Sequence, residues 1–487
     1  MRQIYIVLWF LMTTLLLYRP AIFAQKKLTL EEVLSIAASN SIHSRLAETQ
    51  KEIANNVFQT YKSDRRPQIS FSGAVPMYNK SYAPITQPDG KILFIPVKQN
   101  FSTAGFSLSQ AITATGGQIS LNTNLSRFDD YITNFKQYNA TPIFLALNQP
   151  LGGFNAMRWA RKIEPLRFAE AKKAFSVEME EIRLKATDLY FNVLEAQNDI
   201  TVSRQNVSDY QANYDVETKR IALGTTNQDK LTQLELQVLE AEQTLKTAEY
   251  QLKIARLDLK VFAGITAAED FEVLMPELAT VYYPDAAQAL AFAKKNRPEY
   301  IAFERKQLEA QGELARSKAE KYGVNVAATM GYNNSDLRFA GAYGDLKSQT
   351  TVGVEFDIPM VDWGRRNAKI STAKANLKLQ QYQNMLDEST LAQQITTLVE
   401  SLVLLQNNVL QGQKVQKVAE NRYGFALTNY QAGKYTVTEL SIAQAQRDAA
   451  RKKYTAALRE YWKGHFGFRK LTGFDPVIGK AIAETND

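Results

Sequence analysis

Hydrophobic residues recur along two long stretches of this chain with the spacing of a helical seam. Between Ile182 and Ile200 the apolar positions step by 4, 3, 4, 3 and 4 residues, and residues 391–409 repeat these steps. Sustained alternation of three- and four-residue steps is typical of coiled-coil helices. We therefore predict one long helix at 153–223 and another at 364–432, each roughly 100 Å in length at 1.5 Å per residue.

Each long helix is predicted to end at a glycine and to be followed by a shorter helix. Gly224 and Gly433 come directly after the long stretches, a position that suits a left-handed helix cap. Seams of the same spacing then predict return helices at 228–262 and 437–470. The chain is thus expected to contain two antiparallel helical hairpins.

Shorter stretches alternate apolar and polar residues, as strands with one apolar face do. They fall at about 67–150 and at 324–358. Such strands occur in β-sandwiches, which are more common, and in transmembrane barrels, where a strand needs about 9–11 residues. The aromatic residues among them belong either to the girdle of a barrel or to an ordinary sheet: Phe71, Tyr82, Tyr332 and Phe356.

The order of strand, long helix, turn and return helix occurs twice, at a constant offset of 209 residues. The residues that recur at this offset include Pro150 with Pro359, Gln197 with Gln406, Gly224 with Gly433, and Gly264 with Gly473. Such a duplication indicates a pseudo-symmetric molecule. The helices predicted at 29–62 and 284–321 match at an offset of 256 instead, so the first repeat has about 47 additional residues before Pro150.

The additional residues include a predicted β-hairpin at about 101–127. Two alternating runs flank Thr115, Gly116 and Gly117, and glycine supplies the tight turn. The pattern leaves open whether this hairpin lies in, above or below a membrane. The predicted division of the chain is a signal peptide at 1–24, a first repeat at 25–275, a second repeat at 276–475 and a tail at 476–487.

The first 24 residues have the pattern of a secretory signal peptide. Arg2 is a short basic region, residues 4–18 are apolar, and Ala24 ends a cleavage motif. An uncleaved membrane anchor is the alternative, although the apolar run is short for a spanning helix. No other segment approaches about 18 consecutive apolar residues, so no inner-membrane helix is expected.

Composition and motifs narrow the possible functions. The 58 basic and 50 acidic residues give a net charge of +8, but the charges are spread along helices, so no nucleic-acid partner is expected. Cysteine is absent, which excludes disulfides, and the two histidines, His43 and His465, lie on unrelated predicted helices. No metal site is therefore expected. Phosphate-loop, zinc-protease and serine-hydrolase motifs are absent too, so we expect neither an enzyme nor a cofactor.

Taken in order, these features resemble the TolC-like outer-membrane efflux proteins, the outer membrane factor family. The resemblance covers about residues 25–475 and rests on the leader, the duplication, the alternating strands, the segments 149–151 and 358–360 that lead into helices, and the two turns. It implies an α+β membrane protein. Its long antiparallel coiled-coil helices would form a periplasmic α-barrel, and each chain would give four strands to a shared trimeric transmembrane β-barrel.

The resemblance also implies a function and partners. The protein would be a homotrimer in the outer membrane, with helices extending into the periplasm, and would serve a tripartite efflux pump or a type I secretion system as a passive export duct. A periplasmic adaptor (membrane fusion) protein and an inner-membrane transporter would dock on it. Physical reasoning agrees, because open strand edges are not tolerated in lipid and a cyclic oligomer closes them. The alternative is a soluble periplasmic coiled-coil scaffold or adaptor, and the cargo stays open.

Candidate functional residues follow from the same resemblance. The turns would form the periplasmic tips that contact the adaptor, and the prolines would mark the strand-to-helix bends. The tip residues are Gly224, Thr225, Gly433 and Lys434, and the bend residues are Pro150 and Pro359.

The family often narrows the mouth of its tunnel with acidic residues just after the turn. At the matching positions this chain has Glu439 in the second repeat but Lys230, beside Asp229, in the first. An acidic ring is therefore in doubt. A pairing of Glu439 with Lys230 or Lys434 is an alternative lock, and ordinary surface charges near a helix start are the simpler interpretation.

Overall fold

The computed structural model describes most of the chain in two compact units. The described residues are 26–224, 227–265, 271–278, 283–320, 323–358 and 360–482. The predicted signal peptide, Thr225 and Pro359 lie outside them. The first unit comprises residues up to 49, 175–297 and 392 onward, and the second comprises 50–174 and 298–391.

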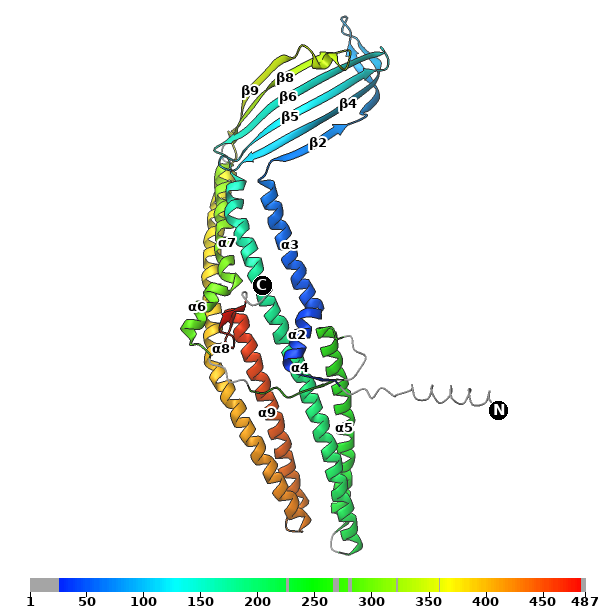
Figure 1. The fold of residues 1–487 in the computed structure, drawn as a ribbon, viewed down its shortest axis with the longest axis vertical. Helices are drawn as coiled ribbons and strands as arrows, with labels where there is room; N and C mark the ends of the chain where they lie inside the picture. The colour runs from blue at the N-terminus through cyan, green and yellow to red at the C-terminus, as the bar shows by residue number, and fades with distance from the viewer. Residues whose placement is uncertain are drawn as a thin grey trace, which may run out of the picture. The chain divides into compact units, whose positions relative to one another are not determined.

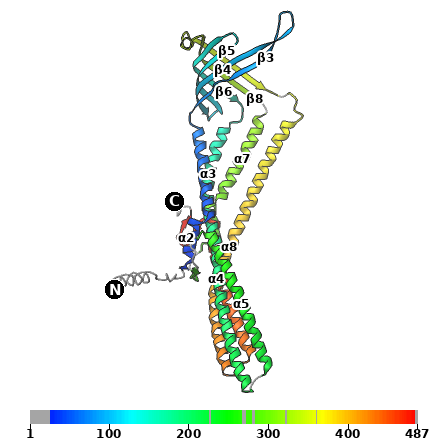
Figure 2. The same ribbon diagram turned by 90° about the vertical axis from the view of Figure 1, so that its right-hand side faces the viewer.

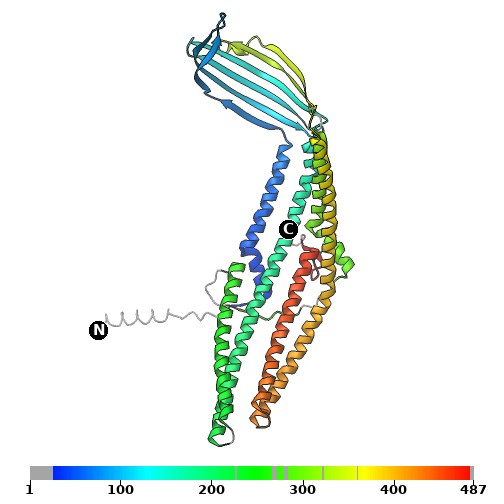
Figure 3. The same cartoon turned by 180° about the vertical axis from the view of Figure 1, so that it is seen from behind.

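Two helical hairpins dominate the first unit. In each, a long helix is followed by a return helix that runs back along it (Figure 1, Figure 3). The N-terminal parts of both long helices belong to the second unit. The first hairpin is α4 (Ala156–Ala222) with α5 (Gln228–Ala263), and the second is α8 (Arg365–Gln431) with α9 (Val437–Thr472).

Two short helices precede the strands in each repeat, where the sequence predicted a single helix. A single helix was expected at 29–62 and another at 284–321, but each is broken in two. The second break falls at Arg297, because the following Pro298 disfavours helical backbone at the residue before it. The four helices are α2 (Leu30–Asn40), α3 (Ile42–Asp64), α6 (Ala286–Asn296) and α7 (Pro298–Ala319).

The core of the first unit is built on the seam of α4. All six seam positions between Ile182 and Ile200 are at most 8% exposed, as the spacing predicts. Apolar residues of α2, α5 and α9 pack against them. A short parallel pair of strands, β1 (Lys26–Leu28) and β7 (Phe271–Val273), adjoins this core. In the described residues, no helix is both long and apolar enough to cross a membrane.

The second unit holds one antiparallel sheet. Its strand order is β2, β4, β5, β6, β8 and β9, and β3 pairs with the first part of β4. The hairpin of β3 and β4 projects beyond the other strands (Figure 2). The strands are β2 (Gln68–Ala74), β3 (Tyr78–Thr86), β4 (Ile92–Ile112), β5 (Gly117–Asp130), β6 (Phe135–Leu151), β8 (Gly323–Asp336) and β9 (Lys347–Asp357).

The number of strands differs from what the resemblance implied. Four strands were expected from each chain, but the described residues form seven in this sheet. The predicted additional hairpin at 101–127 corresponds to the end of β4 and to β5, which pair closely around the turn at Gly116. They lie between β2 and β6. The insertion therefore extends the sheet from within.

Candidate functional site at the ends of the helical hairpins

Both hairpin turns place a glycine in the left-handed region. Gly224 has φ 69° and Gly433 has φ 73°. Among the described residues, no neighbouring atom lies within 4 Å of the position a Cβ would take at either glycine, so backbone conformation rather than space selects glycine. After Gly433, the N–H of Lys434 donates to the carbonyl of Asn429 at 2.9 Å. Gly433 and Lys434 are exposed.

The residues proposed to gate the mouth lie in the first turns of the return helices. The Glu439 carboxylate accepts hydrogen bonds from the Thr436 N–H at 2.7 Å and from its hydroxyl at 2.9 Å, in a capping box. These two donors hold the pKa of Glu439 below its usual value. Asp229 and Lys230 are exposed in the first turn of α5. Among the described residues, no ion pair joins Glu439 to Lys230 or to Lys434.

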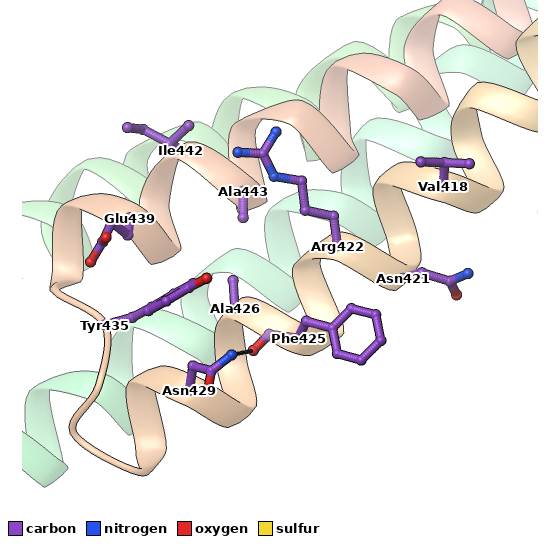
Figure 4. A pocket seen from close by; sticks show the side chains of 10 residues that line it. All are labelled: Val418, Asn421, Arg422, Phe425, Ala426, Asn429, Tyr435, Glu439, Ile442 and Ala443. Carbon is purple, nitrogen blue, oxygen red and sulfur yellow. Dashed lines mark hydrogen bonds between the residues drawn. The ribbon is translucent and has the colours of Figure 1, made fainter.

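A groove lies between α8 and α9 beside this turn (Figure 4). Its volume is about 670 Å³. Several of the apolar side chains that line it stay exposed, and Phe425 is 72% exposed. Figure 4 shows Tyr435 and Glu439 at the end of the groove nearest the turn. Val418, Arg422 and Ile442 also line the groove.

A buried polar network joins the two hairpins a few turns from their ends. Arg447 on α9 is only 2% exposed, and its guanidinium stacks on the ring of Tyr423 of α8 at 4.0 Å. It donates to Asn206 of α4 at 3.1 Å and to Asp448 at 2.9 Å. The Tyr423 hydroxyl donates to Asp209 of α4 at 2.5 Å. The network therefore ties the outgoing helix of the first repeat to both helices of the second.

Electrostatics keep this network charged and paired. Burial raises the pKa of Tyr423, and the hydrogen bond to Asp209 raises it further, so the phenol keeps its proton as a donor. Burial opposes the charge of Arg447, but Asp448, Tyr423 and Asp209 outweigh it and hold the pKa of Arg447 above its usual value. Removing one partner would leave a buried charge uncompensated, which is strongly unfavourable.

Closer to the turns, Tyr430 of α8 is also buried, at 1% exposed. The guanidinium of Arg220 lies 5.5 Å from the centre of its ring, and Arg220 is paired with the buried Glu217 at 3.3 Å. In the described part of the chain, the Tyr430 hydroxyl has no hydrogen-bond partner. Tyr423 and Tyr430 are thus two buried tyrosines on one helix, and within the described residues Tyr423 alone of the two has a partner for its hydroxyl.

Sequence reasoning missed Asp209, Tyr423 and Arg447, because no motif marks them. One signal was present: Arg447 continues the 4, 3, 4, 3, 4 seam that runs from Ala443 to Tyr461. A charged residue at a seam position is costly unless it is paired. The seam therefore indicated a buried partner, although it could not say which residue this was.

Of the two sequence-predicted bend residues, the structure describes Pro150, which belongs to the second unit. Pro150 is the penultimate residue of β6, opposite Asn325, and α4 begins five residues after that strand. Gly152, with φ 69°, lies between them. Within the described ranges, no three His, Cys, Asp or Glu side chains are grouped to hold a metal ion.

Comparison with known proteins decides the family. The family model described as outer membrane efflux protein matches residues 111–264 and 286–473, which is more than half of the chain. The chain belongs to the outer membrane efflux protein family. The two matched segments fall in the two repeats, with the first starting inside the additional hairpin. No curated protein sequence matches the chain significantly.

Solved structures share the fold at low sequence identity. The Campylobacter jejuni CmeC outer membrane channel has a TM-score of 0.66 and 13% identity, over 91% of this chain and 85% of that one. The Vibrio cholerae outer membrane protein VceC has a TM-score of 0.63 and 12% identity, over 92% and 96%. The Neisseria gonorrhoeae MtrE channel, in its open state, has a TM-score of 0.62 and 13% identity, over 91% and 88%.

Family membership gives the general function. This outer membrane efflux protein is an efflux channel of the outer membrane, with helices that extend into the periplasm. Members of the family are passive channels rather than enzymes. They form trimers and work with an adaptor and an inner-membrane pump. The alternative of a soluble scaffold or adaptor is not favoured.

Proposed function

We propose that three copies of this chain form one export duct, in which the strands close a single outer-membrane barrel and the helices line one tunnel. The observation that carries this proposal is a second apolar seam on each of two helices. These seams face away from the core of the chain. The exposed residues include Leu236, Leu239, Tyr250, Leu257 and Val261 on α5, and Leu404, Val415, Val418 and Phe425 on α8.

The spacing of these residues supports a helical partner. Within each set, neighbours are 3, 4, 7 or 11 residues apart. These spacings are close to one, two or three helical turns of about 3.6 residues, which places the residues of each set on one face. Leu239 is 59% exposed and Val418 is 67% exposed. Exposed apolar faces of this length are unfavourable in water and mark interaction surfaces. In a ring of three copies, α5 of one copy packs against α8 of the next, and both seams are buried.

The hairpin ends would receive the partners. We propose that Gly224, Thr225, Gly433 and Lys434 contact the periplasmic adaptor, and that the inner-membrane transporter supplies the energy for export. The exposed turn at Gly433 and the apolar groove beside it support this assignment. Glu439, Lys230 and Asp229 are the candidates for narrowing the mouth of the assembled trimer.

The buried network would hold the channel closed. Because Asp209, Tyr423 and Arg447 tie the two hairpins of one chain together, the hairpins separate only when these contacts break. Docking of the adaptor at the turns would supply the free energy for that separation. The lock within each chain is then distinct from any charge ring at the mouth.

The trimer is tested by the native mass of protein extracted in detergent from purified outer membranes. The unchanged chain should give three copies, and Leu239→Lys should give fewer, because it puts a charge on the α5 seam. Thr244→Lys adds the same charge at an exposed position of α5 that is off the seam, so it is the matched control and should stay trimeric. A soluble monomer in the periplasmic fraction would contradict the proposed duct.

A further inference from the structure

The order of strands in the sheet has a consequence for the width of the barrel. Six strands lie side by side in one antiparallel ladder, from β2 at one edge to β9 at the other. The additional strands β4 and β5 pair with each other over the whole of β5, from Gly117 to Asp130. They also pair with β2 and β6 on either side, so β2 does not reach β6 without them.

One face of the ladder is apolar across the additional strands as well as the others. A row of directly opposed residues crosses from β2 to β8 on this face, and each of its members is exposed. Leu108 and Leu121, on the additional strands, are 39% and 41% exposed. The row is Ile69, Leu108, Leu121, Leu145 and Met330, and it ends at Thr350 of β9.

The opposite face is mostly polar over the same strands. Its rows include Gln68, Ser109, Ser120, Ala146, Thr329 and Thr351. On the additional strands the Ser107 hydroxyl donates to Asn122 at 2.6 Å. Phe144 of β6 is an apolar exception on this face. An exposed apolar face backed by a polar one is what a barrel wall between lipid and an aqueous lumen requires.

We propose that β4 and β5 are wall strands of the barrel, so that each copy contributes six strands and three copies close a barrel of eighteen. The inference rests on the trimer proposed above. An even number of alternating strands leaves β9 of one copy antiparallel to β2 of the next, so the same ladder pattern closes the ring. β4 and β5 pair over all 14 residues of β5. This length is enough to span the hydrocarbon core, which needs a strand of about 9–11 residues.

The consequence is a wider passage than four strands per chain would give. Barrel diameter grows roughly in proportion to the number of strands, so eighteen strands make a barrel about 1.5 times as wide as twelve. Barrels of about 16–18 strands enclose an open aqueous channel. The outer barrel of this protein is therefore not the narrow point of the duct, which places any restriction in the helical part.

Lipid exposure of the additional strands tests the inference in the full-length channel. The chain has no cysteine, so single cysteines at Leu108 and Leu121 can be spin-labelled without background. Accessibility to oxygen, which concentrates in lipid, is compared with accessibility to a water-soluble nickel chelate. Leu145 and Met330, in the same row on β6 and β8, are the matched controls. Ser107 and Asn122 report the opposite face.

Labels at Leu108 and Leu121 should favour oxygen as strongly as those at Leu145 and Met330, while labels at Ser107 and Asn122 favour the nickel chelate. If Leu108 and Leu121 instead report water while Leu145 and Met330 report lipid, the additional hairpin lies outside the membrane. The eighteen-strand barrel is then wrong, although the trimeric duct stands. If all four report water, the proposed duct itself fails.

A measurement on the unchanged protein avoids any effect of labelling on folding. Electron cryomicroscopy of the detergent-extracted trimer counts the strands in cross-section. Eighteen strands around a threefold axis are expected. Twelve strands, with β4 and β5 folded away from the wall, would overturn the inference.

Discussion

Gly264 lies directly against the end of another helix: a Cβ built on it would be 2.7 Å from the carbonyl oxygen of Asn40. The second repeat has the same relationship, since a Cβ on Gly473 would be 2.6 Å from the Cβ of Asn296. Both glycines cap return helices with positive φ. The Asn296 amide also donates to the carbonyl of Gly473 at 3.3 Å. Each return helix thus ends in close contact with the short helix of its own repeat.

This contact predicts that Gly264→Ala destabilises the protein by about 2 kcal/mol or more. Left-handed backbone costs an L-residue roughly 1–2 kcal/mol, and the contact with Asn40 adds the cost of moving a backbone atom, about 1–3 kcal/mol in a well-packed site. The midpoint of thermal unfolding, followed by the helical circular dichroism signal, measures the change.

Gly224→Ala is the matched control, because Gly224 has nearly the same φ but open space around its Cβ position. Its free energy of unfolding should fall only by the cost of the left-handed backbone, roughly 1–2 kcal/mol. Equal losses in the two variants would mean that the contact with Asn40 contributes nothing.

Replacing a turn glycine with a bulky branched residue should weaken export without dissolving the trimer. Gly433→Val forces positive φ on a β-branched residue, which distorts the turn. In the described residues no atom lies within 4 Å of the Cβ position at Gly433, and the change leaves the exposed seams of α5 and α8 untouched. Export of a fluorescent substrate by intact cells should fall, while the native mass stays that of three copies. Normal export by both Gly433→Val and Gly224→Val would contradict the proposal that the turns contact the adaptor.

Replacing each of the two buried tyrosines of α8 with phenylalanine should have a different effect on channel conductance. Tyr423→Phe removes the hydrogen bond to Asp209, and a hydrogen bond to a charged group contributes about 1.5–3 kcal/mol. The hairpins should separate more readily, so single-channel conductance in a planar bilayer should rise. An unchanged conductance would contradict a closing role for the network.

Tyr430→Phe is the control for that experiment. The Tyr430 hydroxyl is buried without a partner in the described residues, so its removal should be neutral or slightly stabilising. Conductance and melting temperature should match those of the unchanged protein. A loss of stability would indicate that the hydroxyl finds a partner in the assembled trimer.

The helical part of the fold was predictable from sequence because its information is local. The three- and four-residue steps from Ile182 to Ile200 identify a seam, and all of its positions are buried. The offset of 209 residues aligned the turns at Gly224 and Gly433, and both have the positive φ that such a turn needs.

The sheet and the polar network were not predictable in the same way, because both depend on non-local pairing. The additional hairpin was visible from the offset, but only the register of Leu108 with Leu121 and of Leu121 with Leu145 places it inside the ladder. Similarly, Arg447 is a charged residue at a seam position, which the sequence shows. Its contacts with Asn206 and Tyr423, however, are with residues more than 20 positions away in sequence.

Acid should destabilise the protein through one histidine. His465 is 3% exposed, and its Nδ1 lies 3.0 Å from the hydroxyl of Tyr283. Burial, helped by the charge of Arg469, lowers the pKa of His465 from 6.5 to about 4. Between these values the unfolded chain binds a proton that the folded chain does not, so stability rises with pH. The folded protein therefore has its full stability with respect to His465 above pH 6.5, and this stability is lost as the pH falls from 6.5 to about 4.

The loss should amount to about 3 kcal/mol, since each unit of pKa shift corresponds to about 1.4 kcal/mol. Melting temperatures between pH 7 and pH 4 measure it for the unchanged protein and for His465→Gln, which cannot take up the proton. Carboxylates titrate in both proteins, so the difference between the two curves isolates His465. Parallel curves for the unchanged protein and His465→Gln would mean that the folded protein admits the charged imidazole without cost.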